Sequence, residues 1–147
     1  MTRSGRMKPV QAIVDATERH EATELAASEE KLAACERKLD ELKQYEHDYR
    51  ESFNARVTAG MGGRPLRDYQ LFLARLAEAI RQQNRIVLDA RAQRDTRQEQ
   101  WREAARRHKA VDHVVDNWRA DERRIAERRE QRDSDERAQR NVTHRIE

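Results

Sequence analysis

The stretch Gly60-Met61-Gly62-Gly63-Arg64-Pro65 holds three of the four glycines and one of the two prolines of this 147-residue chain. Glycine readily adopts the left-handed backbone that ends a helix, and proline fits the first turn of a new one. We therefore predict a turn over about residues 59–65, built on Gly60, Gly62, Gly63 and Pro65. A link this short folds its two flanking helices back on each other, so they should lie antiparallel.

The segments on both sides of the turn carry apolar residues at alternating steps of three and four, which is the heptad spacing of a coiled coil. We call these positions the seam. Before the turn, in a helix over about residues 7–58, they are Leu25, Ser28, Leu32, Cys35, Leu39, Leu42, Glu46, Tyr49 and Phe53. After it, from about residue 66 to 125 or beyond, they are Leu66, Tyr69, Leu73, Leu76, Ile80, Gln83, Val87, Ala90, Arg94, Arg97, Trp101, Ala104, His108, Val111, Val115, Trp118, Glu122 and Ile125. The predicted fold is all-α, a single antiparallel coiled-coil hairpin of two long helices.

Upstream of Leu25 the pattern changes phase. Val10, Val14 and Thr17 keep the heptad spacing, but joining them to Leu25 requires an extra step of four, a stutter that locally unwinds the supercoil. Polar residues fill the seam between these two stretches. Loose pairing is expected there, with Arg94 or Arg97 within reach of Glu21 or Glu24 on the other helix.

The second predicted helix is longer than the first. The first helix has no residues left to pair beyond about Trp118, so the charged segment from Arg119 to Glu147 has no partner within the chain. Ion pairs one turn apart favour a helix by a few tenths of a kcal/mol each. Both a continuing helix and a frayed tail are consistent with this composition.

The composition excludes several classes of function. The chain is 40% charged, but its net charge is only +3 and its acids alternate with its arginines, which argues against a nucleic-acid partner. It has no apolar run of membrane-spanning length. Cys35 is the only cysteine, as is typical of a protein from the reducing cytoplasm. Its seam position predicts a small buried hydrophobe rather than a reactive thiol.

No residue combination indicates catalysis or metal binding. The glycine stretch lacks the Gly-Lys-Ser/Thr ending of a phosphate-binding loop. His20-Glu21 has no second histidine at the spacing of a zinc protease, and His108 and His113 fall on different helix faces. A rod of two helices also offers no pocket in which reactive groups converge. We expect no enzyme, no cofactor and no metal site.

One set of side chains suggests a surface role. Phe72, Leu76, Ala79 and Gln83 follow one another at steps of four, three and four, with Phe72 flanking the seam. Two interpretations stay open. Phe72 covers the edge of the seam, or the four residues form an exposed ridge for a partner, because exposed apolar strips commonly mark partner sites.

The ordered set of these features resembles the FliJ family, the soluble coiled-coil component of the bacterial flagellar type III export apparatus. The similarity runs from Pro9-Val10 to about Trp118. It rests on Leu39, Leu42, Tyr45, Tyr49-Arg50, the glycine turn, Tyr69-Gln70, Phe72, Leu76, Ile80, Gln83 and Trp101-Arg102. The resemblance implies a slim stalk, like the paired terminal helices of the gamma subunit in rotary ATP synthases. Such a stalk inserts into the hexameric flagellar export ATPase and promotes its assembly or activity.

The resemblance also implies partners and contact residues. The contact with the cytoplasmic domain of the export gate would fall on Phe72, Leu76, Ala79 and Gln83. The ATPase contact would fall on Arg6, Val10, Val14, Val115 and Trp118. Export chaperones are further implied partners, and the implied location is the cytoplasm, peripherally at the inner face of the cell membrane.

Two alternatives stay open at the level of the sequence. One is the equivalent stalk of a virulence-type secretion system. The other is a structural coiled-coil scaffold without an ATPase partner. Oligomeric state separates the scaffold from the stalk, because a stalk should be largely monomeric alone.

Overall fold

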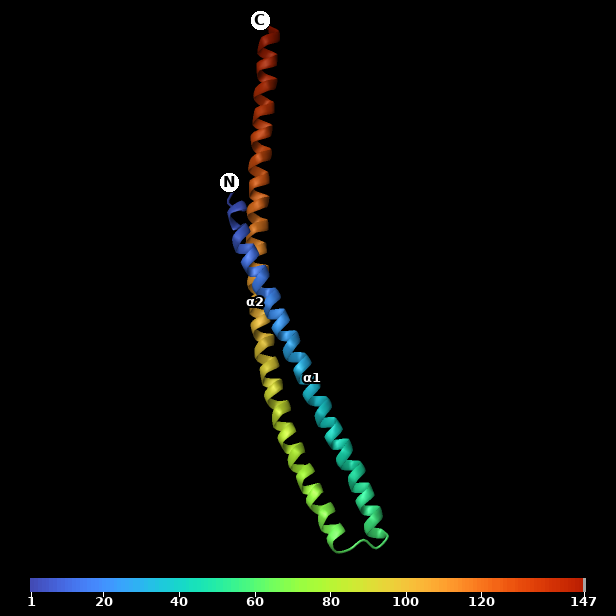
Figure 1. Cartoon of the computed structure of the whole chain (residues 1–147). Helices are drawn as coiled ribbons and strands as arrows, with labels where there is room; N and C mark the ends of the chain where they lie inside the picture. Colours follow the sequence, from blue (N-terminus) through green and yellow to red (C-terminus); the bar gives the residue numbers. More distant parts are fainter. Residues whose placement is uncertain (147) are drawn as a thin grey trace. The chain divides into compact units, whose positions relative to one another are not determined.

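The computed structural model describes residues 1–146 (Figure 1). A short 3-10 helix, η1 (Gly5–Met7), precedes two long α-helices, α1 (Lys8–Thr58) and α2 (Arg64–Ile146). The two long helices pack against each other, and no strand occurs within the described residues. The predicted all-α helical hairpin is confirmed.

The chain divides into two compact units, each of which pairs a piece of α1 with a piece of α2. The first unit contains Met1–His20 and α2 from Arg102 onward, and the second unit is Glu21–Trp101 with the turn. The heptad pattern alone predicts one hairpin without this division.

The turn depends on two of its glycines. Gly60 and Gly63 have φ angles of 101° and 67°, a region that side chains with a Cβ rarely adopt. The Gly60 N–H donates to the carbonyl of Val57, and the Met61 N–H donates to that of Arg56, both at 3.0 Å. This pair of bonds is a Schellman motif, which satisfies the last carbonyls of α1.

The structure adds two details to the predicted turn. Gly62 does not have a positive φ, so the turn does not require glycine there. Helix α2 begins at Arg64, two residues earlier than expected, and Pro65 therefore belongs to its first turn. Proline is well tolerated there because the first N–H groups of a helix have no intrahelical acceptor.

The core of the second unit follows the predicted seam. Leu32, Leu39, Val87 and Ala90 form a buried cluster, against which the half-buried Cys35 packs as a small hydrophobe. A polar side chain is also buried in this seam. Gln83 is 4% exposed, and its amide donates to the Cys35 carbonyl at 3.0 Å. This bond satisfies a polar group that would otherwise be costly to bury.

The predicted stutter near the N-terminus is wrong. The positions that turn inward upstream of Leu25 continue the heptad without a break, and they are Ser4, Met7, Gln11, Val14, Glu18 and Glu21. Val10 is 38% exposed and Thr17 is exposed as well. Ser4, Gln11 and Glu18 can hold inward positions because α2 supplies partners for them. The Gln11 amide, for example, donates to Asp112 at 3.4 Å.

The charged tail is helical in the structure, because α2 continues to Ile146 (Figure 1). Every side chain from Arg123 to Ile146 is exposed. Ion pairs one turn apart, such as Arg140 with Glu136 at 3.9 Å, support this part of the helix. Over residues 1–146, neither long helix contains an apolar stretch that could cross a bilayer.

Candidate binding surfaces

A set of polar contacts holds the N-terminus of the first unit onto α2. Ser4 is 5% exposed, and both its N–H and its hydroxyl donate to the carboxylate of Glu122, at 3.0 and 2.6 Å. The hydroxyl bond is the main reason why the pKa of Glu122 is lowered. Next to it, the Arg3 guanidinium lies 4.0 Å from the centre of the Trp118 ring, a cation–π contact. Trp118 and Glu122 are predicted seam positions, whereas Arg3 and Ser4 were not singled out from the sequence.

His108 forms a second polar cluster in the first unit. Its Nδ1 bonds to Glu18 across the hairpin, and its Nε2 lies 3.3 Å from Asp112 and 3.9 Å from Asp15. The bond to Glu18 is the largest cause of the raised pKa of His108, and the neighbouring carboxylates add to it against the opposing effect of burial. The His108 ring thus joins α1 to α2. The sequence contained a signal for this cluster, because His108 and Glu18 both occupy polar positions in the seam.

None of these clusters is a metal centre. No group of His, Cys, Asp and Glu side chains within residues 1–146 is arranged to hold a metal ion. His108 and its carboxylates act instead as a bridge between helices.

The predicted ATPase-contact residues do not share one surface. Val115 is completely buried, and Val14 and Trp118 are half-buried. Arg6 and Val10 are exposed, and so is Ile13 at 64%. Arg6, Val10 and Ile13 follow one another at steps of four and three, which places them on one face of the N-terminal segment. We call these three residues the N-terminal face.

The predicted gate ridge is also not an exposed strip. Leu76 and Gln83 are 7% and 4% exposed and lie inside the second unit, as their seam positions require. Phe72 and Ala79 are half-buried, and Ile86, seven residues after Ala79, is 46% exposed. A step of seven returns to the same side of a coiled-coil helix. Phe72, Ala79 and Ile86 therefore form a flanking stripe, the name used below.

Five aromatic rings pack together beside the turn, and they are Tyr45, Tyr49, Phe53, Tyr69 and Phe72. The Phe72 and Tyr49 ring centres are 4.4 Å apart, and Tyr45 meets Phe72 edge-on at 6.1 Å. Burial raises the pKa of Tyr49. This aromatic cluster supports the interpretation that Phe72 covers the edge of the seam. A hollow of about 490 Å³ lies beside it, lined in part by Leu71 and Arg75.

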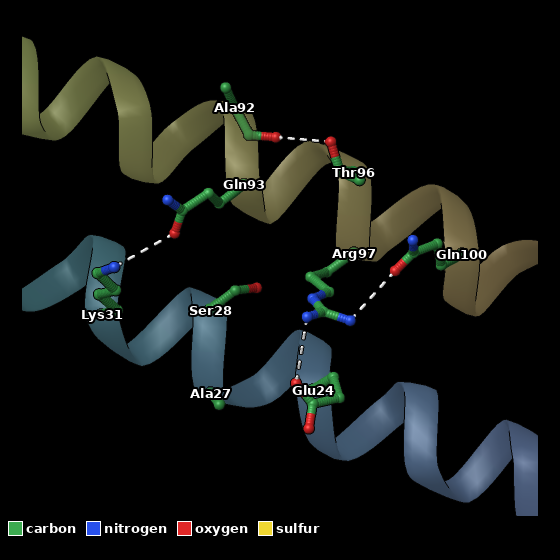
Figure 2. A pocket seen from close by; sticks show the side chains of 9 residues that line it. All are labelled: Glu24, Ala27, Ser28, Lys31, Ala92, Gln93, Thr96, Arg97 and Gln100. Carbon is green, nitrogen blue, oxygen red and sulfur yellow. Dashed lines mark hydrogen bonds and ion pairs between the residues drawn. The ribbon is translucent and has the colours of Figure 1, made fainter.

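The polar part of the seam in the second unit borders an open groove of about 560 Å³ (Figure 2). Arg97 pairs with Glu24 at 3.5 Å, as one of the predicted alternatives requires. Arg94 pairs instead with its neighbour Asp95. Lys31 of α1 donates to Gln93 of α2 at 3.2 Å, a bond that Figure 2 also shows. The groove's polar groups thus bond α1 to α2, and no nucleophile with an adjacent base lies among its lining residues.

The fold and these surfaces define a helical coiled-coil protein whose candidate sites are contact surfaces rather than a pocket of converging reactive groups. A family model described as the flagellar FliJ protein matches residues 3–147, essentially the whole chain. The chain therefore belongs to the FliJ family and is a component of the flagellar protein export apparatus. The match continues beyond Trp118, where the resemblance noted from the sequence ends. Comparison with curated proteins and with solved structures found no match.

Proposed function

We propose that this chain is a non-enzymatic stalk of the flagellar export apparatus, which inserts into the hexameric export ATPase and promotes its assembly or activity. The observation that carries the proposal is the unpaired end of α2. Residues 123–146 form an exposed helix that extends past the last pairing contact, Ser4 with Glu122. A single helix is about 10–12 Å across with its side chains, so this end is narrow enough to enter the centre of a ring.

The ATPase contact is proposed on the N-terminal face and the exposed end of α2. Val10 and Ile13 are apolar and exposed beside Arg6, which is the combination expected of a docking surface. Val14 and Trp118 lie at the margin of this proposed contact. The side chain of Val115 is completely buried, so it cannot touch the ATPase directly. Its proposed role is to hold the two helices together beneath the contact.

The gate contact is proposed on the flanking stripe. Phe72 and Ala79 remain accessible, and Ile86 continues the same side. Leu76 and Gln83 would act indirectly, by holding α2 in the orientation that presents this stripe. Export chaperones are proposed as further partners, and the proposed location is the cytoplasm, peripherally at the inner face of the cell membrane.

The test is the rate of ATP hydrolysis by the export ATPase, titrated with the full chain and with a chain that ends at Ile125. Ending there keeps Glu122, which anchors Ser4. Stimulation that saturates well below one chain per ATPase subunit is expected of a central stalk. The shortened chain should stimulate less. No stimulation at any ratio would reject the stalk.

A double change on the N-terminal face locates the contact. Val10→Asp with Ile13→Asp should reduce the stimulation, because two exposed apolar side chains become charged. The matched control is Leu88→Asp, the same kind of change at a side chain that is 60% exposed in the second unit and lies outside both proposed contacts. Equal loss in both variants would mean that the N-terminal face is not the ATPase contact.

Two alternatives to a flagellar stalk are a coiled-coil scaffold and the stalk of a virulence-type secretion system. Light scattering separates a largely monomeric stalk from a scaffold that dimerises through both helices. The family match favours a flagellar component over the equivalent stalk of a virulence-type secretion system.

A further inference from the structure

Positive side chains flank the turn. Residues 52–77, which we call the turn surface, contain four arginines and one acid, Asp68. Their net charge is +3, and an acid, Glu51 or Glu78, follows at each end of the segment. The arginines are Arg56, Arg64, Arg67 and Arg75.

These arginines are available to a partner. All four are exposed, and within residues 1–146 none of them forms an ion pair. Arg56 rests over the Tyr69 ring, 5.3 Å from its centre, a contact that leaves its charge uncompensated. Elsewhere in the second unit, Arg91 pairs with Glu36 and Arg97 with Glu24 across the hairpin.

Exposed apolar side chains accompany this charge in the helix segments that flank the turn. Val57 is 41% exposed and Leu71 is 53% exposed, while Met61 is half-buried in the loop itself. Apart from its chain neighbours, no residue has a heavy atom within 4 Å of where a Cβ would stand at Gly60, Gly62 or Gly63. Figure 1 shows the loop at the end of the paired helices, with nothing packed over it.

We propose that the turn surface binds the headgroups of an anionic lipid membrane. A projecting loop fits a flat surface, arginines meet the phosphates, and exposed aliphatic side chains enter the interface between headgroups and acyl chains. A nucleic acid would offer the arginines phosphates but no apolar layer for Val57 and Leu71. This inference deepens the peripheral location proposed above and rests on it.

The test is flotation of the full chain with vesicles of phosphatidylcholine alone and with vesicles that contain equal amounts of phosphatidylcholine and phosphatidylglycerol. The turn variant carries Arg56→Gln, Arg64→Gln and Arg67→Gln. The matched control carries Arg128→Gln, Arg129→Gln and Arg132→Gln on the exposed end of α2. Both variants lower the net charge by the same three units. Circular dichroism checks that both remain helical.

The native chain and the control should bind the anionic vesicles, less strongly as salt is raised, and ignore the neutral ones. Each arginine near an anionic surface is worth roughly a fivefold change in affinity, so the turn variant should bind on the order of 100-fold more weakly. Absence of binding, equal binding to both vesicles, or equal loss in both variants would overturn the inference. Contact of the turn surface with the export gate alone, without vesicle binding, would also overturn it. The assay contains no ATPase, so its failure would leave the stalk untouched.

Discussion

Replacing Leu39 by alanine should lower the free energy of unfolding of the second unit by about 2–3 kcal/mol. Leu39 is 8% exposed and packs in a cluster with Leu32, Val87 and Ala90. The substitution removes three carbon groups, each worth about 0.8 kcal/mol when buried, or about 2.4 kcal/mol in total. A seam between only two helices is open at its sides, so the space left behind can collapse or fill with water. The cost should therefore lie near the low end of the ~2–5 kcal/mol found in full cores.

Urea unfolding, followed by circular dichroism, measures this effect. With a slope of about 2 kcal/mol per molar urea, the midpoint should fall by about 1 M. The three tyrosines all lie in the second unit, so their near-ultraviolet signal reports on it. Leu71→Ala is the matched control, because the same atoms are removed from a side chain that is 53% exposed. Its cost should stay within about 0.5 kcal/mol. Equal costs at the two positions would refute the assigned register of the seam.

Three further changes address the first unit and the turn. Because the pKa of His108 is raised above 6.5, its stabilising charge is fully present below that pH and is lost as the pH rises through the raised value. The unfolding free energy of the first unit should fall accordingly, and His108→Gln should abolish this pH dependence; an unchanged profile in the variant would contradict the assignment. Gly60→Ala with Gly63→Ala should cost about 1–2 kcal/mol per site and favour swapped dimers, measured by denaturation and light scattering. Gly62→Ala should leave both unchanged, and dimers in that variant would show the backbone argument to be wrong. Glu122→Gln should speed hydrogen exchange in the N-terminal segment, most clearly above pH 4.5 where the native carboxylate is charged; equal exchange in both chains would rule out this anchor.

The sequence predicts the fold wherever apolar residues define the heptad. From Leu25 to Phe53 and from Leu66 to Trp118, every predicted seam position is buried or half-buried. The pattern misleads near the N-terminus. Val10 is apolar yet turns outward, whereas Gln11 and Glu18 turn inward. The spacing of apolar residues contains no information about polar partners on the other helix. In the structure, Asp112 bonds to Gln11 and His108 bonds to Glu18.

The candidate site was less predictable, because it depends on which side of each helix remains uncovered. The spacing of Leu76 and Gln83 fits both an exposed ridge and the buried seam. The packing of the second unit buries both side chains, so they belong to the seam. Ser4 gave no signal at all. Its partner Glu122 lies 118 residues away in the sequence, and no local pattern joins them. The glycine turn, by contrast, depends on neighbouring residues alone and was placed to within two residues.

The aromatic cluster beside the turn also bears on the order in which the chain folds. Tyr49 and Phe72 are only 23 residues apart, against 118 for Ser4 and Glu122. Closing the shorter loop costs about 1.5 kcal/mol less conformational entropy. We therefore expect the transition state for folding to form at the turn, with high φ-values at Phe72 and low ones at Glu122; the reverse order would contradict this account. The N-terminal segment, made first on the ribosome, would then be the last part of the hairpin to acquire its partner.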